Sequence, residues 1–274
     1  MADAQYFAGV MCYTGEGVAP NTTEASAWFQ LAMDQGRVDA YRKIGEFLMK
    51  GVGFAENIDD GVNLFRWAAE HGSKEAQYDM GHFCLNDSYG PPNPEEAVKW
   101  LKMAAQQGLP NAHLKLGQIL KYGQGVAQNL DAAREFFRSA AKLGDRFAQY
   151  ELGLIYLNGD AVGVNKKETV KWLKMAAQRG HLNAQIKRGQ ILINGLGVPK
   201  DFNEARELFR PAAERGDRIA QYEMGQMCLY DRGGDVDMTE AAKWLKMAAE
   251  QDEPHSQNLL GDLYYTGHGL PPRF

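Results

Sequence analysis

A seven-residue segment occurs three times in this sequence at a fixed spacing. Lys-Trp-Leu-Lys-Met-Ala-Ala stands at 99–105, 171–177 and 243–249, which sets a constant 72-residue interval. A shorter period of 36 residues, half of that interval, is marked by eight glycines. These glycines are Gly9, Gly45, Gly81, Gly117, Gly153, Gly189, Gly225 and Gly261. Such strict periodicity is typical of a repeat array and not of an ordinary globular domain.

Each 36-residue unit carries the pattern of two helices. With the recurring glycine as position 0, the first helix is expected from about −7 to +5 and the second from about +13 to +26, as at 75–86 and 94–107. Apolar residues at −5, −1, +2 and +3 share one side of the first helix. A glycine at +27 suits a helix end, and the short connection that follows makes neighbouring helices pack antiparallel.

The predicted fold is therefore all-α, an α-solenoid of antiparallel αα-hairpins with a 36-residue period and a 72-residue super-period. We expect one array over 1–274, with repeats at 3–38, 39–74, 75–110, 111–146, 147–182, 183–218 and 219–254 and a half repeat at 255–270. Tryptophan marks the super-period at +19, and this large residue is expected to fill the space beside the small ones. The four are Trp28, Trp100, Trp172 and Trp244.

Charges at −2 of the first helix also alternate between neighbouring repeats. Acidic side chains at this position are Asp79, Glu151 and Glu223, and basic ones are Lys43, Lys115 and Lys187. Because neighbouring repeats stack side by side, we expect the side chains at this position to form ion pairs between repeats. Exposed ion pairs of this kind contribute about 0.2–1 kcal/mol each to stability. We therefore expect them to fix the register of neighbouring repeats more than to stabilise the fold.

The repeat pattern resembles the Sel-one-like repeat family, a relative of the tetratricopeptide repeats. The matching residues of the fifth repeat are Ala148, Leu152, Gly153, Tyr156, Gly159, Val162, Trp172, Leu173, Ala176, Ala177 and Gly180. The fourth repeat adds the Gly-x-Gly-Val turn at 123–126. The resemblance covers 3–270 and implies a right-handed superhelix used as an adaptor in protein complexes. It also implies that many bacterial relatives are exported or periplasmic, some acting in host interaction, some in envelope assembly and some as immunity proteins against secreted effectors.

Two repeats depart from this pattern. Gly90-Pro91-Pro92 in the third and Gly233-Gly234-Asp235 in the seventh stand where Gly-x-Gly-Val is expected, so these two turns are expected to differ.

Composition narrows the classes of partner. The net charge is −5 with 24% charged residues and no basic block. This balance argues against nucleic acid and anionic membranes. No apolar run approaches the roughly 18–20 residues of a membrane span, so no membrane insertion is expected. We expect a soluble protein, cytoplasmic if Met1 is the native start and periplasmic or exported if a signal peptide has been removed.

The chemistry-bearing residues predict no cofactor, metal or catalytic site. Cys12, Cys84 and Cys228 all occupy +3, on parallel helices too far apart for a disulfide, and are expected to be core thiols. The six histidines show no metal-ligand spacing. Asp231, Asp235 and Asp237 lack the ligand ladder of a calcium loop and are expected in a solvated turn.

The candidate binding surface is the side of the first helices opposite the apolar stripe, at −3, +1, +4 and +5. In tetratricopeptide arrays the equivalent side lines a concave groove. The predicted partner-binding residues are Tyr78, His82, Asn86, Lys121, Tyr122, Tyr150, Leu154, Asn158, Ile193, Asn194, Tyr222 and Gln226. Tyrosine provides contact area and a hydroxyl, and asparagine can bond a peptide backbone as donor and acceptor. The alternative is that the tyrosines at −3 pack against the previous repeat.

Together these observations predict a non-catalytic scaffold or adaptor that holds a protein or peptide partner in a concave groove. The narrower hypothesis, a bacterial immunity protein that binds a secreted effector, rests on the resemblance alone. The alternatives are a passive structural spacer and an enzyme acting on cell-wall material. Because the predicted helix at 255–266 has no second helix after it, we also expect either a fragment of a longer chain or a homo-oligomer formed through uncapped ends.

Overall fold

The computed structural model describes residues 1–159, 163–230, 232 and 236–267, and these contain fifteen α-helices, one short 3-10 helix and no strand. The first helices of the repeats are α1 (Ala2–Thr14), α3 (Val38–Lys50), α5 (Lys74–Phe83), α7 (Pro110–Tyr122), α9 (Arg146–Asn158), α11 (Leu182–Asn194), α13 (Arg218–Leu229) and α15 (Pro254–Thr266). The second helices are α2 (Thr22–Asp34), α4 (Ile58–Glu70), α6 (Pro94–Gln106), α8 (Leu130–Lys142), α10 (Lys166–Gln178), α12 (Phe202–Glu214) and α14 (Met238–Ala249). The 3-10 helix η1 spans Asp87–Tyr89. The all-α prediction is confirmed.

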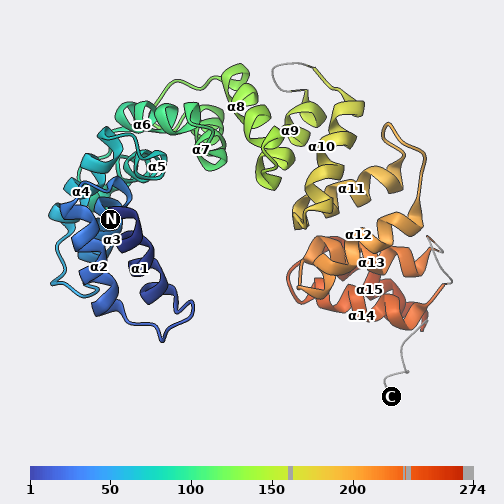
Figure 1. The fold of residues 1–274 in the computed structure, drawn as a ribbon. Coiled ribbons are helices and arrows are strands. Elements are labelled where there is room, and N and C mark those ends of the chain that lie inside the picture. The colour runs from blue at the N-terminus through green and yellow to red at the C-terminus, as the bar shows by residue number, and fades with distance from the viewer. Residues whose placement is uncertain (160–162, 231, 233–235, 268–274) are drawn as a thin grey trace. The chain divides into compact units, whose positions relative to one another are not determined.

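The helices fall into two compact units, Met1–Ala140 and Ala141–Phe274, with the boundary inside α8. Consecutive helices contact each other from α1 to α7 in the first unit and from α9 to α15 in the second (Figure 1). Each unit is thus built from successive helical hairpins, as the short connections predict. That the whole chain is one domain stays a prediction.

Local signals fix where the helices begin and end. Every second helix is preceded by an asparagine or aspartate at +12, whose side chain accepts a backbone N–H three residues on. Asn21, for example, accepts from the N–H of Glu24 at 3.1 Å. The other caps at this position are Asn57, Asn93, Asn129, Asn165, Asp201 and Asp237. Most first helices end on a glycine in the left-handed conformation, such as Gly123 with φ 62°.

The third repeat departs from this scheme, as its Gly-Pro-Pro sequence predicts. The helix α5 ends at Phe83, before the expected Asn86. Asn86 instead caps η1 by accepting the backbone N–H of Ser88 at 2.9 Å. In the seventh repeat α13 ends at Leu229, but Asp231 and Gly233-Gly234-Asp235 lie outside the described residues.

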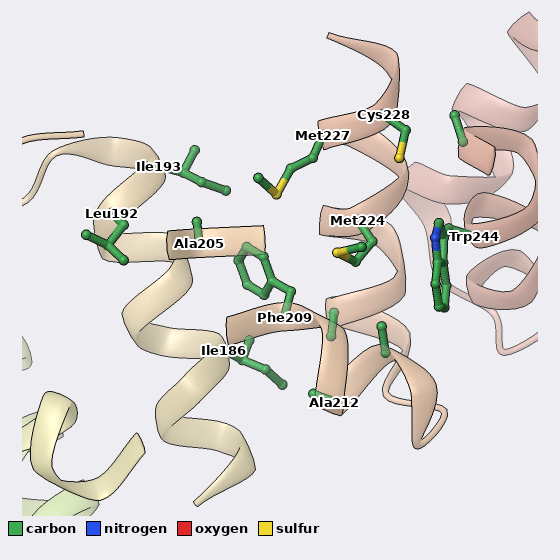
Figure 2. Close-up of a cluster of buried hydrophobic side chains, with 13 residues drawn as sticks. Ile186, Leu192, Ile193, Ala205, Phe209, Ala212, Met224, Met227, Cys228 and Trp244 are labelled. Atoms are coloured by element: carbon green, nitrogen blue, oxygen red, sulfur yellow. The ribbon is translucent and has the colours of Figure 1, made fainter. Parts of the chain in front are cut away.

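The core of each repeat is centred on the recurring glycine, and here one prediction is wrong. The side chain that fills the space beside this glycine comes from +20, not from the tryptophan position at +19. These residues are Phe29, Phe65, Leu101, Phe137, Leu173, Phe209 and Leu245, all of them buried. In Figure 2, Phe209 of α12 lies between Ile186 of α11 and Met224 of α13. One residue corresponds to about 100° of rotation, so a neighbouring position points elsewhere.

The tryptophans at +19 have a different role. The indole N–H of Trp172 donates to the carboxylate of Glu168, one turn earlier in α10, at 2.8 Å. Trp100 and Trp244 make the equivalent bond to Glu96 and Glu240, at 3.2 and 3.3 Å. This gives each ring a partner for its polar edge while its face packs on the helix surface.

For Asp79 and Glu223, the expected ion pairs between side chains at −2 are replaced by other partners. Asp79 pairs with Arg42 through Nε and Oδ2 at 2.6 Å, because Lys43 is already bound to Glu46 one turn along α3 at 3.0 Å. The side-chain amide of Gln190 donates to Glu223 at 3.0 Å. The prediction that Asp79 and Glu223 form ion pairs with the lysines at −2 of neighbouring repeats is therefore wrong.

Candidate binding pockets on the first helices

The twelve predicted binding residues lie on or directly after first helices, and their exposure varies. The exposed ones are His82, Tyr122, Asn158 and Asn194. The half-buried ones are Tyr78, Asn86, Lys121, Tyr150, Leu154, Tyr222 and Gln226. Ile193 is only 9% exposed and belongs to the hydrophobic cluster of Figure 2, so it has little area to offer a partner.

Two of the tyrosines at −3 contact residues at the start of the next first helix. The ring of Tyr150 stacks on His181, which caps α11, with centroids 4.5 Å apart and planes at 21°. Tyr222 lies 5.7 Å from the ring of His255 on α15 and accepts a hydrogen bond from Gln226. The alternative, in which the tyrosines at −3 pack against the previous repeat, stays a prediction. Because these rings are half-buried in a repeat junction, they position the next helix and keep only part of their surface exposed.

A pocket of about 320 Å³ opens between α3 and α5 in the first unit. The helix α3 supplies Arg42, Glu46, Met49 and Lys50, which hold the −3, +1, +4 and +5 positions of the second repeat. These positions share one face because −3, +1 and +4 or +5 are three or four residues apart, which is about one helical turn. The remaining lining residues are Ile58, Phe65, Asp79, Phe83 and Tyr89.

Charged side chains on one side of this pocket neutralise one another. Arg42 pairs with Asp79 at 2.6 Å, and Glu46 pairs with both Lys43 at 3.0 Å and Lys50 at 2.8 Å. Burial raises the pKa of Asp79, against the opposing charge of Arg42. Burial also opposes ionisation of Glu46, but its hydrogen bonds to Lys50 and Lys43 outweigh this effect and lower its pKa. The pocket therefore offers hydrogen-bonding groups of both signs.

The pocket also has aromatic lining residues. Phe83 meets Phe65 edge to face, with centroids 5.0 Å apart, and lies 4.6 Å from the ring of Tyr89. Tyr89 reaches this place because η1 replaces the last turn of α5. The prediction from sequence missed Phe65, Phe83 and Tyr89 as pocket residues. The signal that could have found them is the Gly-Pro-Pro departure at 90–92, which changes the course of the chain.

A second pocket, of about 220 Å³, occupies the equivalent place between α13 and α15 in the second unit. Leu229 at the end of α13, Tyr230 directly after it and Met238 at the start of α14 line one part of this pocket. They hold the same repeat positions as Met49, Lys50 and Ile58 of the first pocket. The residues from α15 are Leu259, Asp262, Leu263 and Thr266. Five repeat positions, −2, +2, +4, +5 and +13, are therefore shared by the two pockets, of which the first is more charged and the second more apolar.

The described residues offer neither a metal-binding cluster nor a membrane-spanning helix. Within the described ranges no group of three or more His, Cys, Asp or Glu side chains is arranged to hold a metal ion. None of the described helices has the length and apolar character needed to cross a membrane. The three cysteines are free thiols, with Cys12 and Cys228 buried and Cys84 half-buried.

The helical hairpins and their recurring pockets define a helical repeat protein. The family model "Sel1 repeat" matches at 2–36, 38–73, 74–109, 110–145, 146–181, 182–217, 218–253 and 254–273, so the chain belongs to the Sel1 repeat family. This confirms the resemblance noted from the sequence. Members of the family are typically non-catalytic protein-interaction scaffolds.

Solved structures agree with this assignment. A Sel1 repeat protein from Oxalobacter formigenes is similar, with a TM-score of 0.74 and 30% identity over 96% of this chain and 76% of that one. The protein c5321, a protective antigen present in uropathogenic Escherichia coli strains, gives a TM-score of 0.68 and 26% identity over 100% of this chain and 66% of that one. No curated protein matches the sequence.

Proposed function

We propose that this protein is a non-catalytic scaffold that binds a protein partner across the pocket-bearing faces of its first helices. The observation that carries the proposal is the recurrence of a pocket at the same repeat positions in both units. Within each unit, a pocket that combines apolar and polar lining residues on packed helices suits a side chain and the adjacent backbone of a polypeptide.

The size and chemistry of the pockets support a protein partner over a small molecule. Their volumes are about 320 and 220 Å³. These values lie at or below the lower end of the roughly 300–1,000 Å³ of small-molecule sites. Aromatic walls beside paired charges suit an apolar side chain with a neighbouring polar backbone group. The titratable groups of the larger pocket are engaged with one another in ion pairs, which favours binding over catalysis.

Site-specific photo-crosslinking in the native host tests this proposal. A photoreactive amino acid replaces Lys50 in the first pocket and Tyr230 in the second, both of which are exposed. Lys102 and Lys174 serve as matched controls, one in each unit, because they are exposed on second helices away from the pockets. We expect the same partner protein to be captured from the pocket positions and not from the controls.

Three outcomes would count against the proposal. Equal capture from Lys102 and Lys174 would mean that the partner does not recognise the first helices. Absence of any capture, with the chain folded and expressed, would favour the passive spacer. Hydrolysis of cell-wall material by the purified chain, abolished by Asp79→Asn, would support the enzyme alternative.

The immunity-protein hypothesis is a narrower form of the same proposal. It predicts that co-expression of this chain protects cells from one secreted effector, and that Tyr150→Ala with Asn158→Ala weakens the protection. Protection unaffected by that double substitution, and also by Phe83→Ala, would remove both surfaces from the binding site.

A further inference from the structure

A pocket of about 290 Å³ in the second unit lies at the starts of α9 and α11 and the end of α12. Its lining includes Arg146 and Phe147 of α9, His181, which caps α11, Asn183 of α11, and Arg215 directly after α12. None of its described lining residues is acidic. It shares no described lining residue with the two pockets above, so it is a separate site.

The two arginines of this pocket have no carboxylate partner in the part of the chain that the structure describes. Arg146 donates through Nη1 to the backbone carbonyl of the residue directly after α10 at 3.3 Å, a bond that does not neutralise its charge. Asp145 and Asp217, which stand within two residues of these arginines, accept backbone N–H groups as caps of α9 and α13, at 2.7 and 2.9 Å. Glu214 precedes Arg215 but does not line the pocket. The pocket therefore presents two positive charges without a paired negative one.

The first unit shows the carboxylates that this pocket lacks. At the start of α3, Arg37 pairs with Asp3 and Asp39 at 3.0 and 2.8 Å. Both aspartates hold the −6 position of their repeats. In the second unit the same position carries Phe147 and Asn183, and both of these line the pocket. The repeat position that neutralises an arginine in the first unit therefore offers no charge here.

The pocket also has an apolar surface beside its charges. Phe147 is 48% exposed, although its ring is held on two sides. The guanidinium carbon of Arg146 lies 5.1 Å from the ring centroid, and the ring meets that of His181 edge to face, with centroids 5.1 Å apart and planes at 76°. An ordered aromatic ring next to two cations suits a ligand that carries an anionic group and an apolar group close together.

We propose that this pocket binds a glutamate or aspartate side chain of a partner protein, with a neighbouring apolar residue of the partner on Phe147. The inference rests on the proposed function, since it takes a protein as the partner. A guanidinium and a carboxylate form paired, charge-assisted hydrogen bonds, so charge complementarity selects an acidic side chain. The amide of Asn183 can donate to the same carboxylate. Arg37 with its two aspartates is the example of this recognition within the chain itself.

The test uses the intact protein with isotope-labelled histidines and the peptide acetyl-Phe-Glu-amide. The chain has six histidines, and the His181 signal can be assigned from its loss in His181→Asp. Because His181 lines the pocket, its ring signals should shift on titration and saturate with a Kd at or below about 5 mM. The signals of His71, which lies in the first unit, should stay in place. Acetyl-Phe-Gln-amide has the same shape without the charge and should bind at least about fivefold more weakly.

The matched substitutions in the protein are Arg146→Gln, Arg215→Gln and Arg218→Gln, each of an exposed residue. Arg218 is the control, because it holds the repeat position of Arg146 and donates to a backbone carbonyl at 3.3 Å in the same way, but does not line the pocket. The two pocket variants should each weaken binding of acetyl-Phe-Glu-amide at least about fivefold. The control should change it less than about twofold, as expected for a charge outside the site. Melting temperatures confirm that all three variants are folded.

Three results would overturn the proposal. The first is the absence of a shift at His181 up to about 20 mM peptide. The second is equal binding of the two peptides, or equal weakening by Arg146→Gln and Arg218→Gln. The third is displacement of the peptide by inorganic phosphate at equal concentration, which would assign the pocket to a free anion.

This test is independent of photo-crosslinking from Lys50 and Tyr230. Failure of the peptide to bind, with crosslinking intact, would overturn the assignment of the arginine-lined pocket alone. Peptide binding without crosslinking would support that assignment and count against the partner surface proposed for the other two pockets.

Discussion

Gly225 and Gly261 hold the same repeat position in the same unit, yet their surroundings are opposite. Leu245 approaches Gly225 so closely that a Cβ there would lie 2.7 Å from its Cγ, whereas no described residue comes within 4 Å of that point at Gly261. The residue type is identical, so the difference comes from the presence of a second helix. Among the described residues, the recurring glycine therefore has a packing role where a second helix lies against it.

The largest expected effect follows from removing the side chain that fills the space beside Gly225. Leu245 is fully buried. Leu245→Ala leaves a cavity beside Gly225, so the free energy of unfolding should fall by about 2–5 kcal/mol. The control is Tyr265→Ala on α15, because the Tyr265 side chain is 94% exposed. Its loss should change the free energy of unfolding by about 0.5 kcal/mol at most.

Chemical denaturation monitored by circular dichroism measures both variants. Equal losses of stability in Leu245→Ala and Tyr265→Ala would mean that α15 is packed as tightly as α13.

The two glycines should respond to alanine with opposite signs. Gly225→Ala forces the new Cβ against Leu245 and the packed helices, which should cost about 1–3 kcal/mol. Gly261→Ala meets no described atom and gains helix propensity, so it should raise stability by up to about 1 kcal/mol. Thermal unfolding of the two variants measures the difference. A loss of stability in Gly261→Ala would show that another segment packs against Gly261.

The starts of α11 and α15 should differ in their response to pH. His181 caps α11 by accepting the backbone N–H of Ala184 on Nδ1 at 3.2 Å. This bond requires the neutral ring. Burial, followed by the charge of Arg146, lowers the pKa of His181 below its ordinary value of 6.5. The unfolded chain therefore binds a proton more readily, and stability should fall as the pH drops below about 6.5, by about 0.5–2 kcal/mol if the cap is lost.

Glu253 caps α15 and should keep its cap over that pH range. Burial opposes its ionisation, but hydrogen bonds from Ser256 outweigh the burial and lower its pKa below 4.5. This contribution is therefore lost only at more acidic pH. Melting temperatures of the parent and of His181→Asp between about pH 7 and pH 5 test the contrast. Asp145 and Asp217 cap the neighbouring first helices, so aspartate is expected to cap α11 as well. The melting temperature of His181→Asp should therefore fall much less between about pH 7 and pH 5 than that of the parent. An unchanged decline would place the pH response elsewhere.

The sequence predicted the helix face that carries the candidate pockets but not the residues that line them, because none of the twelve predicted binding residues lines either pocket. Helical spacing placed −3, +1, +4 and +5 on one face, and the residues at these positions of α3 do line a pocket. The pocket's aromatic wall depends on Tyr89, which η1 brings beside Phe83, and no period predicts that contact. Ile193 fits the predicted face by position but is buried, because its neighbours in α12 and α13 enclose it. Which residues bind a partner stays a prediction.

The sequence by itself determined the fold class and the order of hairpins, because these depend on local signals. Apolar periodicity, asparagine caps and left-handed glycines act within a few residues of one another and recur along the chain. Only the tertiary structure decided that +20 and not +19 fills the space beside the recurring glycine, and that no described residue approaches Gly261 in the same way. Those outcomes depend on how one helix is rotated and placed against another, which is set by packing between helices and not by local sequence.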